Sequence, residues 1–164
     1  MPEGRRKFYA WGYEDQTAST EEMRPVLDTW REVFGVDDFE ADPPPTLESI
    51  DMPPGRIARI PAPLEQICHT DRYERALHAY GRSFLDGARM FRGDFRNAPD
   101  VVAYPRDEAD LRALLDWCGD IDAAVIPFGG GSSVVGGVNP EIEGRYSAVV
   151  TIDMWHLGQV LEVD

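Results

Sequence analysis

The sequence has few cysteines and no long hydrophobic run. Its two cysteines, Cys68 and Cys118, lie far apart and form no CxxC pattern, so neither a zinc site nor a redox pair is encoded locally. No apolar run approaches the length of about 20 residues that a membrane span needs. The basic start of the chain is not followed by an apolar signal core. We therefore expect two free thiols, no metal site, no transmembrane segment and a cytoplasmic location.

Positive charge is also scarce. The chain has 16 lysines and arginines against 30 aspartates and glutamates, a formal net charge of −14, and Lys7 is its only lysine. Proteins that bind nucleic acids gain much of their affinity by neutralising phosphates with basic residues, so we expect no nucleic-acid partner. The length of 164 residues and the hydrophobic fraction of 43% are sufficient for one ordinary globular domain.

Residues 1–70 read as an irregular, partly helical N-terminal arm. Proline runs at 43–45 and 53–54 interrupt this segment, and one helix is predicted between them and the N-terminus. Ser19 or Thr20 caps that helix, apolar residues recur at a spacing of three to four up to Phe34, and Gly35 ends it. Because the arm has too few apolar residues to close a core, we expect it to pack on a larger body.

The following segments alternate between helix and strand patterns. Residues 71–96 form a helical lead-in of two short helices that are broken near Gly81. In residues 97–164 we expect a strand at 101–104, a helix capped by Asp107, a strand at 123–127, a third strand at 148–154 and the start of a fourth at 159–164. The helix should bury Ala109, Leu111, Leu114, Leu115 and either Cys118 or Trp117. The predicted fold is α+β, a helical arm followed by a β-α-β-β unit, and we expect the chain to be a truncated N-terminal portion.

A glycine-rich loop follows the second predicted strand. A phosphate site needs several backbone N–H groups that point into one concavity, and side chains small enough for the phosphate to approach the main chain. The loop meets both conditions and adds two hydroxyl groups. The candidate binding residues are Pro127, Phe128, Gly129, Gly130, Gly131, Ser132, Ser133 and Val134.

What the loop lacks narrows the choice of phosphate ligand. No lysine closes the glycine run, so it is not the Walker A loop of a nucleoside triphosphatase. Val134 stands where the Rossmann fingerprint needs glycine, and Pro140 opposes the helix that should follow. A flexible turn between two strands is the structural alternative, but the apolar strand before the loop and the two serines inside it favour a phosphate site.

The loop from Pro127 to Val138 resembles the pyrophosphate loop of the PCMH-type, or vanillyl-alcohol-oxidase-type, FAD-binding flavoproteins. The flanks at 99–115 and 149–164 resemble the first strand, helix and next strand pair of that family. Within the family the closest resemblance is to the alkyldihydroxyacetonephosphate synthases, and next to the FAD-linked D-2-hydroxyacid (lactate or glycolate) dehydrogenases. The resemblance implies that Pro127 to Ser133, and less strictly Val134, surround the FAD pyrophosphate.

The resemblance also implies an FAD-dependent oxidoreductase that, in the synthase case, exchanges an acyl for an alkyl group in ether lipid synthesis. Catalytic residues and a cap domain for a small or lipid-like substrate would lie beyond Asp164, so we assign no catalytic residue to this chain. The full-length protein would be compatible with a homodimer and a membrane-peripheral location. A truncated, catalytically incomplete nucleotide-binding fragment is the alternative.

No histidine lies in or beside the glycine loop, so we expect FAD to bind noncovalently. We interpret His69 as a loop residue, His78 as a helix residue and His156 as following a strand, all with surface or packing roles. The four tryptophans are expected to be packing residues and not to stack on a flavin: Trp11, Trp30, Trp117 and Trp155.

Overall fold

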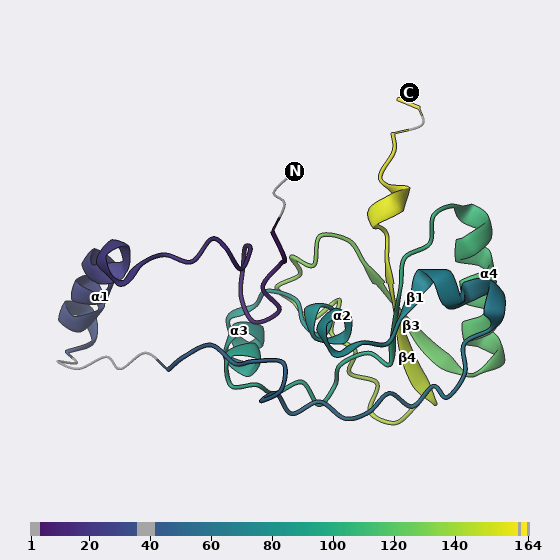
Figure 1. The fold of residues 1–164 in the computed structure, drawn as a ribbon, viewed down its shortest axis with the longest axis horizontal. Helices are drawn as coiled ribbons and strands as arrows, with labels where there is room; N and C mark the ends of the chain where they lie inside the picture. Colours follow the sequence, from purple (N-terminus) through teal and green to yellow (C-terminus); the bar gives the residue numbers. More distant parts are fainter. Residues whose placement is uncertain (1–3, 36–41, 161, 164) are drawn as a thin grey trace.

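The computed structural model describes residues 4–35, 42–160, 162 and 163. In chain order the elements are α1 (Thr20–Phe34), the 3₁₀ helix η1 (Ala62–Ile67), β1 (Cys68–His69), α2 (Arg72–Leu77), α3 (Phe84–Phe91), β2 (Val101–Ala103), α4 (Glu108–Asp120), β3 (Ala123–Phe128), β4 (Ala148–Asp153) and the 3₁₀ helix η2 (Trp155–Leu157). This arrangement is a mixed α/β fold with a small sheet (Figure 1).

The sheet has four strands in the order β1-β2-β4-β3. Strands β2, β4 and β3 are parallel, and β1 pairs with β2 in the antiparallel direction. Helix α4 connects β2 to β3, which confirms the predicted β-α-β unit, but β4 inserts between the two strands. All six residues of β4 are buried, as expected for the central strand of a sheet that is covered on both faces.

Two hydrophobic clusters form the core, and the first of them includes residues of the sheet. Helix α4 lies on one side and the lead-in helices α2 and α3 lie on the other (Figure 1). The α4 side is lined by Leu64, Ile67, Val101, Ala103, Leu114, Trp117, Cys118, Val150 and Ile152. The other cluster contains Phe8, Ile50, Met52, Ala76, Ala79, Tyr80, Met90, Phe95 and Ala98. Phe8 therefore ties the N-terminal segment to the helical lead-in.

Helix α1 has the predicted ends but not the predicted packing. A capping box between Ser19 and Glu22 starts it, and Gly35 ends it in the left-handed conformation with φ of 61°. None of its residues is buried, and Figure 1 shows it standing away from the sheet and its helices. Within this chain, the expectation that the arm packs on a larger body is therefore not met by α1.

Several smaller expectations are also wrong. Ala109 and Leu115 are exposed on α4, because the buried stripe of this helix runs through Leu114, Trp117 and Cys118. The short 3₁₀ helix η2 follows β4, and residues 159, 160, 162 and 163 belong to no strand, while the other two positions of the predicted fourth strand lie outside the described residues.

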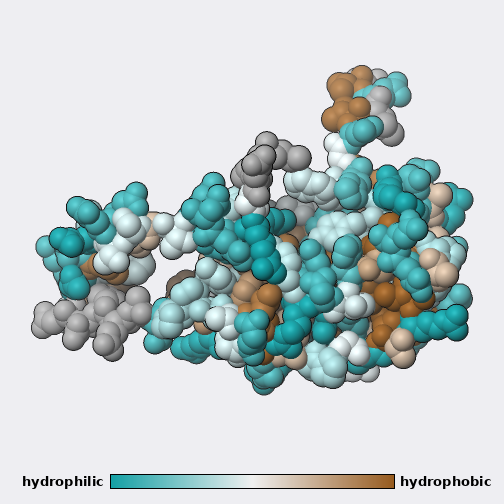
Figure 2. Space-filling view, in the orientation of Figure 1, coloured by the Kyte–Doolittle hydropathy of each residue, from teal (hydrophilic) through white to brown (hydrophobic). Residues whose placement is uncertain are grey.

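The surface is mainly hydrophilic in the face shown in Figure 2. Trp117 is buried as predicted, but Trp11 and Trp155 are 64% and 63% exposed and Trp30 is 45% exposed. His69 lies in β1 and not in a loop, since its backbone pairs with that of Val102. Among the described residues, no helix is both long and apolar enough to cross a membrane.

Candidate functional site

The three parallel strands end at one edge of the sheet. β2, β3 and β4 end at Ala103, Phe128 and Asp153, and the glycine-rich loop leaves β3 at this edge. In open sheets of parallel strands, ligands bind outside the carboxyl ends of the strands. The fold therefore places the predicted phosphate loop where such a sheet binds its ligand.

A buried histidine–carboxylate pair lies at the carboxyl end of β4, beneath the glycine-rich loop. His78, the C-cap of α2, is fully buried, and its Nε2 lies 2.9 Å from Oδ2 of Asp153. Its Nδ1 lies 2.8 Å from the carbonyl oxygen of Glu74. Because that carbonyl can only accept, Nδ1 is the donor in this contact. The ring of His78 packs on that of Phe128 at 4.5 Å, so the pair holds the last residue of β3 below the loop.

Tyr104 lies beside the same pair, just after β2. Its hydroxyl donates to Oε2 of Glu74 at 2.6 Å. Burial, together with this hydrogen bond, raises the pKa of Tyr104 well above its usual value. Tyr104 is therefore a neutral phenol near neutral pH, and its position at the wall of a cavity of about 350 Å³ lets it orient a ligand but not act as a base.

The glycines of the loop differ in what surrounds them. A Cβ atom added at Gly129 or Gly130 would meet nothing within 4 Å, so their backbone faces open space. Gly131 is buried with φ of +69°, and a Cβ there would lie 2.5 Å from Cζ of Phe128. Gly131 is thus required by the fold, whereas Gly129 and Gly130 leave room for a ligand at the main chain.

The backbone of the loop also leaves donors available. The N–H groups of Gly130, Gly131 and Ser132 make no hydrogen bond within the described residues. Such groups, next to glycines without side chains, are what a bound pyrophosphate requires. The residues at this edge therefore fit the phosphates of a dinucleotide.

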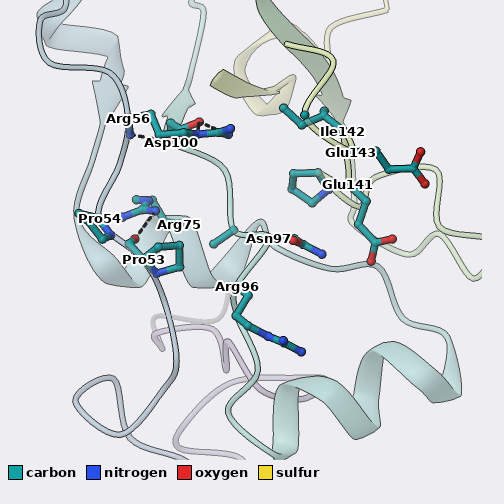
Figure 3. Close-up of a pocket in the computed structure, with 13 residues that line it drawn as sticks. Pro53, Pro54, Arg56, Arg75, Arg96, Asn97, Asp100, Glu141, Ile142 and Glu143 are labelled. Carbon is teal, nitrogen blue, oxygen red and sulfur yellow. Dashed lines mark hydrogen bonds and ion pairs between the residues drawn. The ribbon is translucent and has the colours of Figure 1, made fainter. Parts of the chain in front are cut away.

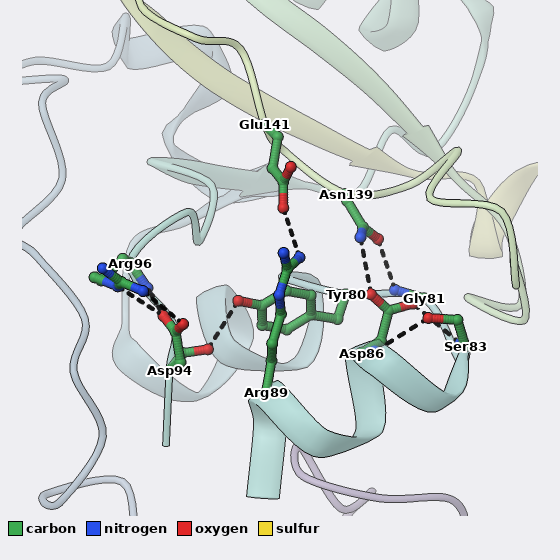
Figure 4. A network of polar contacts seen from close by, with 9 residues as sticks. All are labelled: Tyr80, Gly81, Ser83, Asp86, Arg89, Asp94, Arg96, Asn139 and Glu141. Atoms are coloured by element: carbon green, nitrogen blue, oxygen red, sulfur yellow. Dashed lines mark hydrogen bonds and ion pairs between the residues drawn. The ribbon is translucent and has the colours of Figure 1, made fainter. Parts of the chain in front are cut away.

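The far end of the loop is anchored to the connection between α2 and α3. The carbonyl oxygen of Ser133 accepts from the N–H of Arg82 at 2.6 Å, and a Cβ at Gly81 would overlap this oxygen. Asn139 accepts from the N–H of Gly81 and donates to Asp86, as Figure 4 shows. These contacts hold the loop in one conformation before a ligand arrives.

The eight predicted binding residues do not share one cavity. Gly130 lines a cavity of about 280 Å³, whereas Val134, which is 62% exposed, lines a separate one of about 380 Å³ beside Asp86 and Arg89. Pro127 is exposed at the end of β3, and Phe128 is fully buried beneath the loop. The contact of these residues with FAD stays a prediction, and the geometry favours Gly129 to Ser132 within the set.

Sequence reasoning missed three cations at the same cavity. Arg6, Lys7 and Arg82 line it together with Gly130. One signal in the sequence could have indicated two of them: the basic run that ends at Lys7 includes the only lysine of an acidic chain. Because this run lies in the irregular N-terminal segment, the sequence alone does not connect it with the loop.

A further cavity, of about 350 Å³, lies at the opposite edge of the sheet (Figure 3). Asp100, which precedes β2, accepts hydrogen bonds there from the backbone and side chain of Arg56 and from the N–H of Val149. Burial alone would raise the pKa of Asp100, but these hydrogen bonds hold it below its ordinary value. Since Asp100 joins two segments and the strand edge, its role is structural.

Comparison with known proteins identifies the region around the loop. Residues 99–164 match the model of a family described as FAD binding domain. This part of the chain therefore resembles an FAD-binding domain. Within the described residues, no group of three or more His, Cys, Asp or Glu side chains is placed to hold a metal ion.

Curated proteins similar to this chain include two enzymes of one name. Alkyldihydroxyacetonephosphate synthases of Trypanosoma brucei brucei and Dictyostelium discoideum are each 34% identical over 94 residues, which is 57% of this chain and 15% of the relative. The mitochondrial D-lactate dehydrogenase [cytochrome] of Arabidopsis thaliana is 29% identical over 85 residues, or 52% of this chain and 14% of the relative. The chain thus spans about one seventh of each relative in these alignments.

The fold agrees with a solved structure of an alkyldihydroxyacetonephosphate synthase. The TM-score is 0.74 at 22% identity, and the match covers 97% of this chain and 34% of that one. The predicted resemblance of this chain to the alkyldihydroxyacetonephosphate synthases is confirmed in sequence by the curated relatives and in fold by this structure. The match extends beyond residues 99–164 and includes most of the N-terminal part of the chain.

Proposed function

We propose that this chain binds the pyrophosphate of FAD, without a covalent link, as part of a flavoenzyme of the alkyldihydroxyacetonephosphate synthase type. The observation that carries the proposal is the open backbone at Gly129 and Gly130, at the carboxyl edge of a domain whose family binds FAD. The predicted set from Pro127 to Val134 belongs to this proposal. When bound, FAD supplies a reversible acceptor for two electrons.

The residues of this chain bind and orient. Free N–H groups at Gly130 to Ser132 would donate to the phosphate oxygens, and Phe128 below Gly131 keeps these groups in place. The noncovalent mode is supported by the histidines of the chain. Both ring nitrogens of His78 have partners, and His69 and His156 line a cavity that does not include the glycine loop.

The activity of the complete protein is the finer part of the proposal. The first candidate is exchange of an acyl for an alkyl group in ether lipid synthesis, which the similarity to two curated synthases supports. Oxidation of a D-2-hydroxyacid is the second candidate, which the similarity to a D-lactate dehydrogenase supports. A cap domain for the substrate, a homodimer and a cytoplasmic location complete the proposal.

Titration of the purified chain with FAD tests the binding proposal. We expect the flavin fluorescence to change with a stoichiometry of one FAD per chain, and riboflavin, which lacks phosphates, to bind far more weakly. Equal binding of riboflavin and FAD, or no binding of either at millimolar concentration, would overturn the proposal. For the two activities of the complete protein, D-lactate added without oxygen to its flavin-loaded form should bleach the flavin absorbance only in the dehydrogenase case.

A further inference from the structure

A cluster of cations faces the glycine-rich loop across one cavity. The cavity of about 280 Å³ beside Gly130 is lined by Arg6 and Lys7 from the N-terminal segment and by Arg82 from the connection between α2 and α3. Its remaining lining residues are Ala10, Trp11, Gly12, Tyr13 and Trp155. No carboxylate belongs to this lining. In a chain of net charge −14, three cations at one cavity without an acidic lining residue call for an explanation.

These cations have no carboxylate partner among the described residues. Lys7 is 8% exposed and its ammonium donates one hydrogen bond, to the carbonyl oxygen of Gln16 at 2.8 Å. Arg82 donates to the carbonyl oxygen of Gly81 and to Sδ of Met90. No ion pair of Arg6, Lys7 or Arg82 occurs in the part of the chain that the structure describes. Buried or half-buried cations without a counter-ion are costly unless an anion joins them.

The electrostatics of Arg82 agree with this picture. Burial and the like charge of Arg6 lower the pKa of Arg82, so these two guanidinium groups act on one another. Asp86 opposes this effect, but its two oxygens already accept from the N–H of Ser83 and from Nδ2 of Asn139. An anion between Arg6 and Arg82 would relieve their repulsion.

The N-terminal segment is held in place by the folded body. Phe8 is 4% exposed and packs on Phe95 at a ring distance of 5.7 Å. The hydroxyl of Tyr73 donates to the carbonyl oxygen of Arg6 at 2.9 Å, and Arg6 pairs with Tyr13 in an antiparallel bridge. Arg6 and Lys7, which directly precede Phe8, are therefore positioned before a ligand binds, which lowers the entropic cost of binding.

Exposed aromatic rings complete the cavity. Trp11 and Trp155 are 64% and 63% exposed, and the guanidinium of Arg82 lies 5.6 Å from the ring of Trp11. Exposed rings of this size beside cations suit a ligand that combines a flat ring with phosphate groups. FAD, with two aromatic ring systems joined by a pyrophosphate, has this chemistry.

We propose that Arg6, Lys7 and Arg82 form the second half of the dinucleotide site, in which they bind the phosphate groups that the backbone of the glycine loop holds from the other side. This inference rests on the proposed binding of FAD and adds a part of the chain, residues 4–16, that lies outside the matched family region. The N-terminal segment is then an integral part of the cofactor site and not an arm.

The test compares charge-removing variants in the full chain. We would titrate FAD, riboflavin and inorganic pyrophosphate into Arg6→Gln, Lys7→Gln and Arg82→Gln, with Arg24→Gln on the exposed helix α1 as the matched control for net charge. Each of the three variants should bind FAD about tenfold or more weakly, as expected for loss of a charge-assisted hydrogen bond to phosphate. The control should bind like the wild type, and thermal unfolding of each variant separates loss of binding from loss of folding.

The outcomes separate this inference from the binding proposal. If the wild type binds FAD and the three variants bind it equally well, the inference is overturned and FAD binding stands. If the wild type binds pyrophosphate but not FAD, and the variants lose it, a phosphate site stands without a flavin. If pyrophosphate binds beside FAD without competing, the cations serve a separate phosphorylated molecule and the assignment to the dinucleotide is wrong. Binding of neither ligand overturns both.

Discussion

Substitution of adjacent glycines in the loop should separate affinity from stability. Gly130→Ala places a methyl group where nothing lies within 4 Å, and φ of Gly130 is outside the left-handed region, so we expect stability to change by less than about 0.5 kcal/mol. The same methyl group would stand between the free N–H groups and a bound phosphate. Loss of one or two charge-assisted hydrogen bonds, at about 1.5 to 3 kcal/mol each, corresponds to at least a tenfold loss of FAD affinity.

Gly131→Ala, in contrast, should lower the stability of the fold. A residue with a Cβ costs about 1 to 2 kcal/mol in the left-handed conformation that Gly131 adopts at φ of +69°. Its Cβ would also lie 2.5 Å from the Phe128 ring, and overpacking of this kind costs about 1 to 3 kcal/mol. Together these give about 2 to 5 kcal/mol, or a fall in melting temperature of about 4 to 20 °C for a protein of this size.

Thermal unfolding followed by circular dichroism, and fluorescence titration with FAD, measure the two effects on the same samples. The expected pattern is an unchanged melting temperature with weakened FAD binding for Gly130→Ala, and a lowered melting temperature for Gly131→Ala. The reasoning is refuted if Gly130→Ala binds FAD as tightly as the wild type, or if Gly131→Ala melts at the same temperature. Gly129→Ala, which also has open space at its Cβ, provides an independent repeat of the Gly130→Ala experiment.

Three further predictions follow from single contacts. Asp100→Asn should lower the free energy of unfolding by about 2 kcal/mol at pH 7. The hydrogen bonds from Arg56 hold the pKa of Asp100 below its ordinary value, so this stabilisation is present above about pH 4 and is lost as the pH falls through the folded-state pKa. The free energies of unfolding of variant and wild type, measured in urea, should therefore converge in acid. Burial raises the pKa of the partly buried Cys68 thiol to about 12 and that of the buried Cys118 thiol to about 11, so a thiol reagent at pH 8 should react slowly until urea is added. Fast reaction of both thiols in the native chain would contradict this prediction. Ser19→Ala removes the capping box of α1 at a cost of about 1 kcal/mol, and since α1 has no buried residue, it should reduce helical signal without shifting the main melting transition.

Local signals in the sequence predicted the elements well, and non-local pairing was the part they could not predict. Ser19 and Gly35 bound α1 as expected, and Asp107 caps α4, because capping depends on a few neighbouring residues. The insertion of β4 between β2 and β3 depends on which apolar strands meet in space, and all three are apolar. The two residues of β1 are too few for a periodic pattern, so His69 was placed in a loop.

For the same reason, the sequence predicts the glycine loop of the candidate site but not the cations that face it. The glycine loop is one continuous motif, and its position after a strand at the carboxyl edge follows from the β-α-β pattern alone. Arg6 and Arg82 come from two distant segments, and tertiary contacts such as the packing of Phe8 on Phe95 and the hydrogen bond from Tyr73 bring the first of them to the loop. Hydrophobic periodicity contains no information on where an irregular segment docks, so the N-terminal segment is predicted as an arm.

The acidity of the chain is compatible with a pyrophosphate at this edge because the nearby carboxylates have donors of their own. Asp153 is held by His78, Glu74 accepts from the hydroxyl of Tyr104, and Asp86 accepts from a backbone N–H and a side-chain amide. Each bond draws negative charge toward a protein donor, while the cations at the cavity beside the loop lack carboxylate partners within the described residues. The local field at the loop therefore favours an anion although the net charge is −14. Because this attraction acts between partly exposed charges, the affinity for FAD should fall as salt is added, and more steeply in the wild type than in Arg6→Gln.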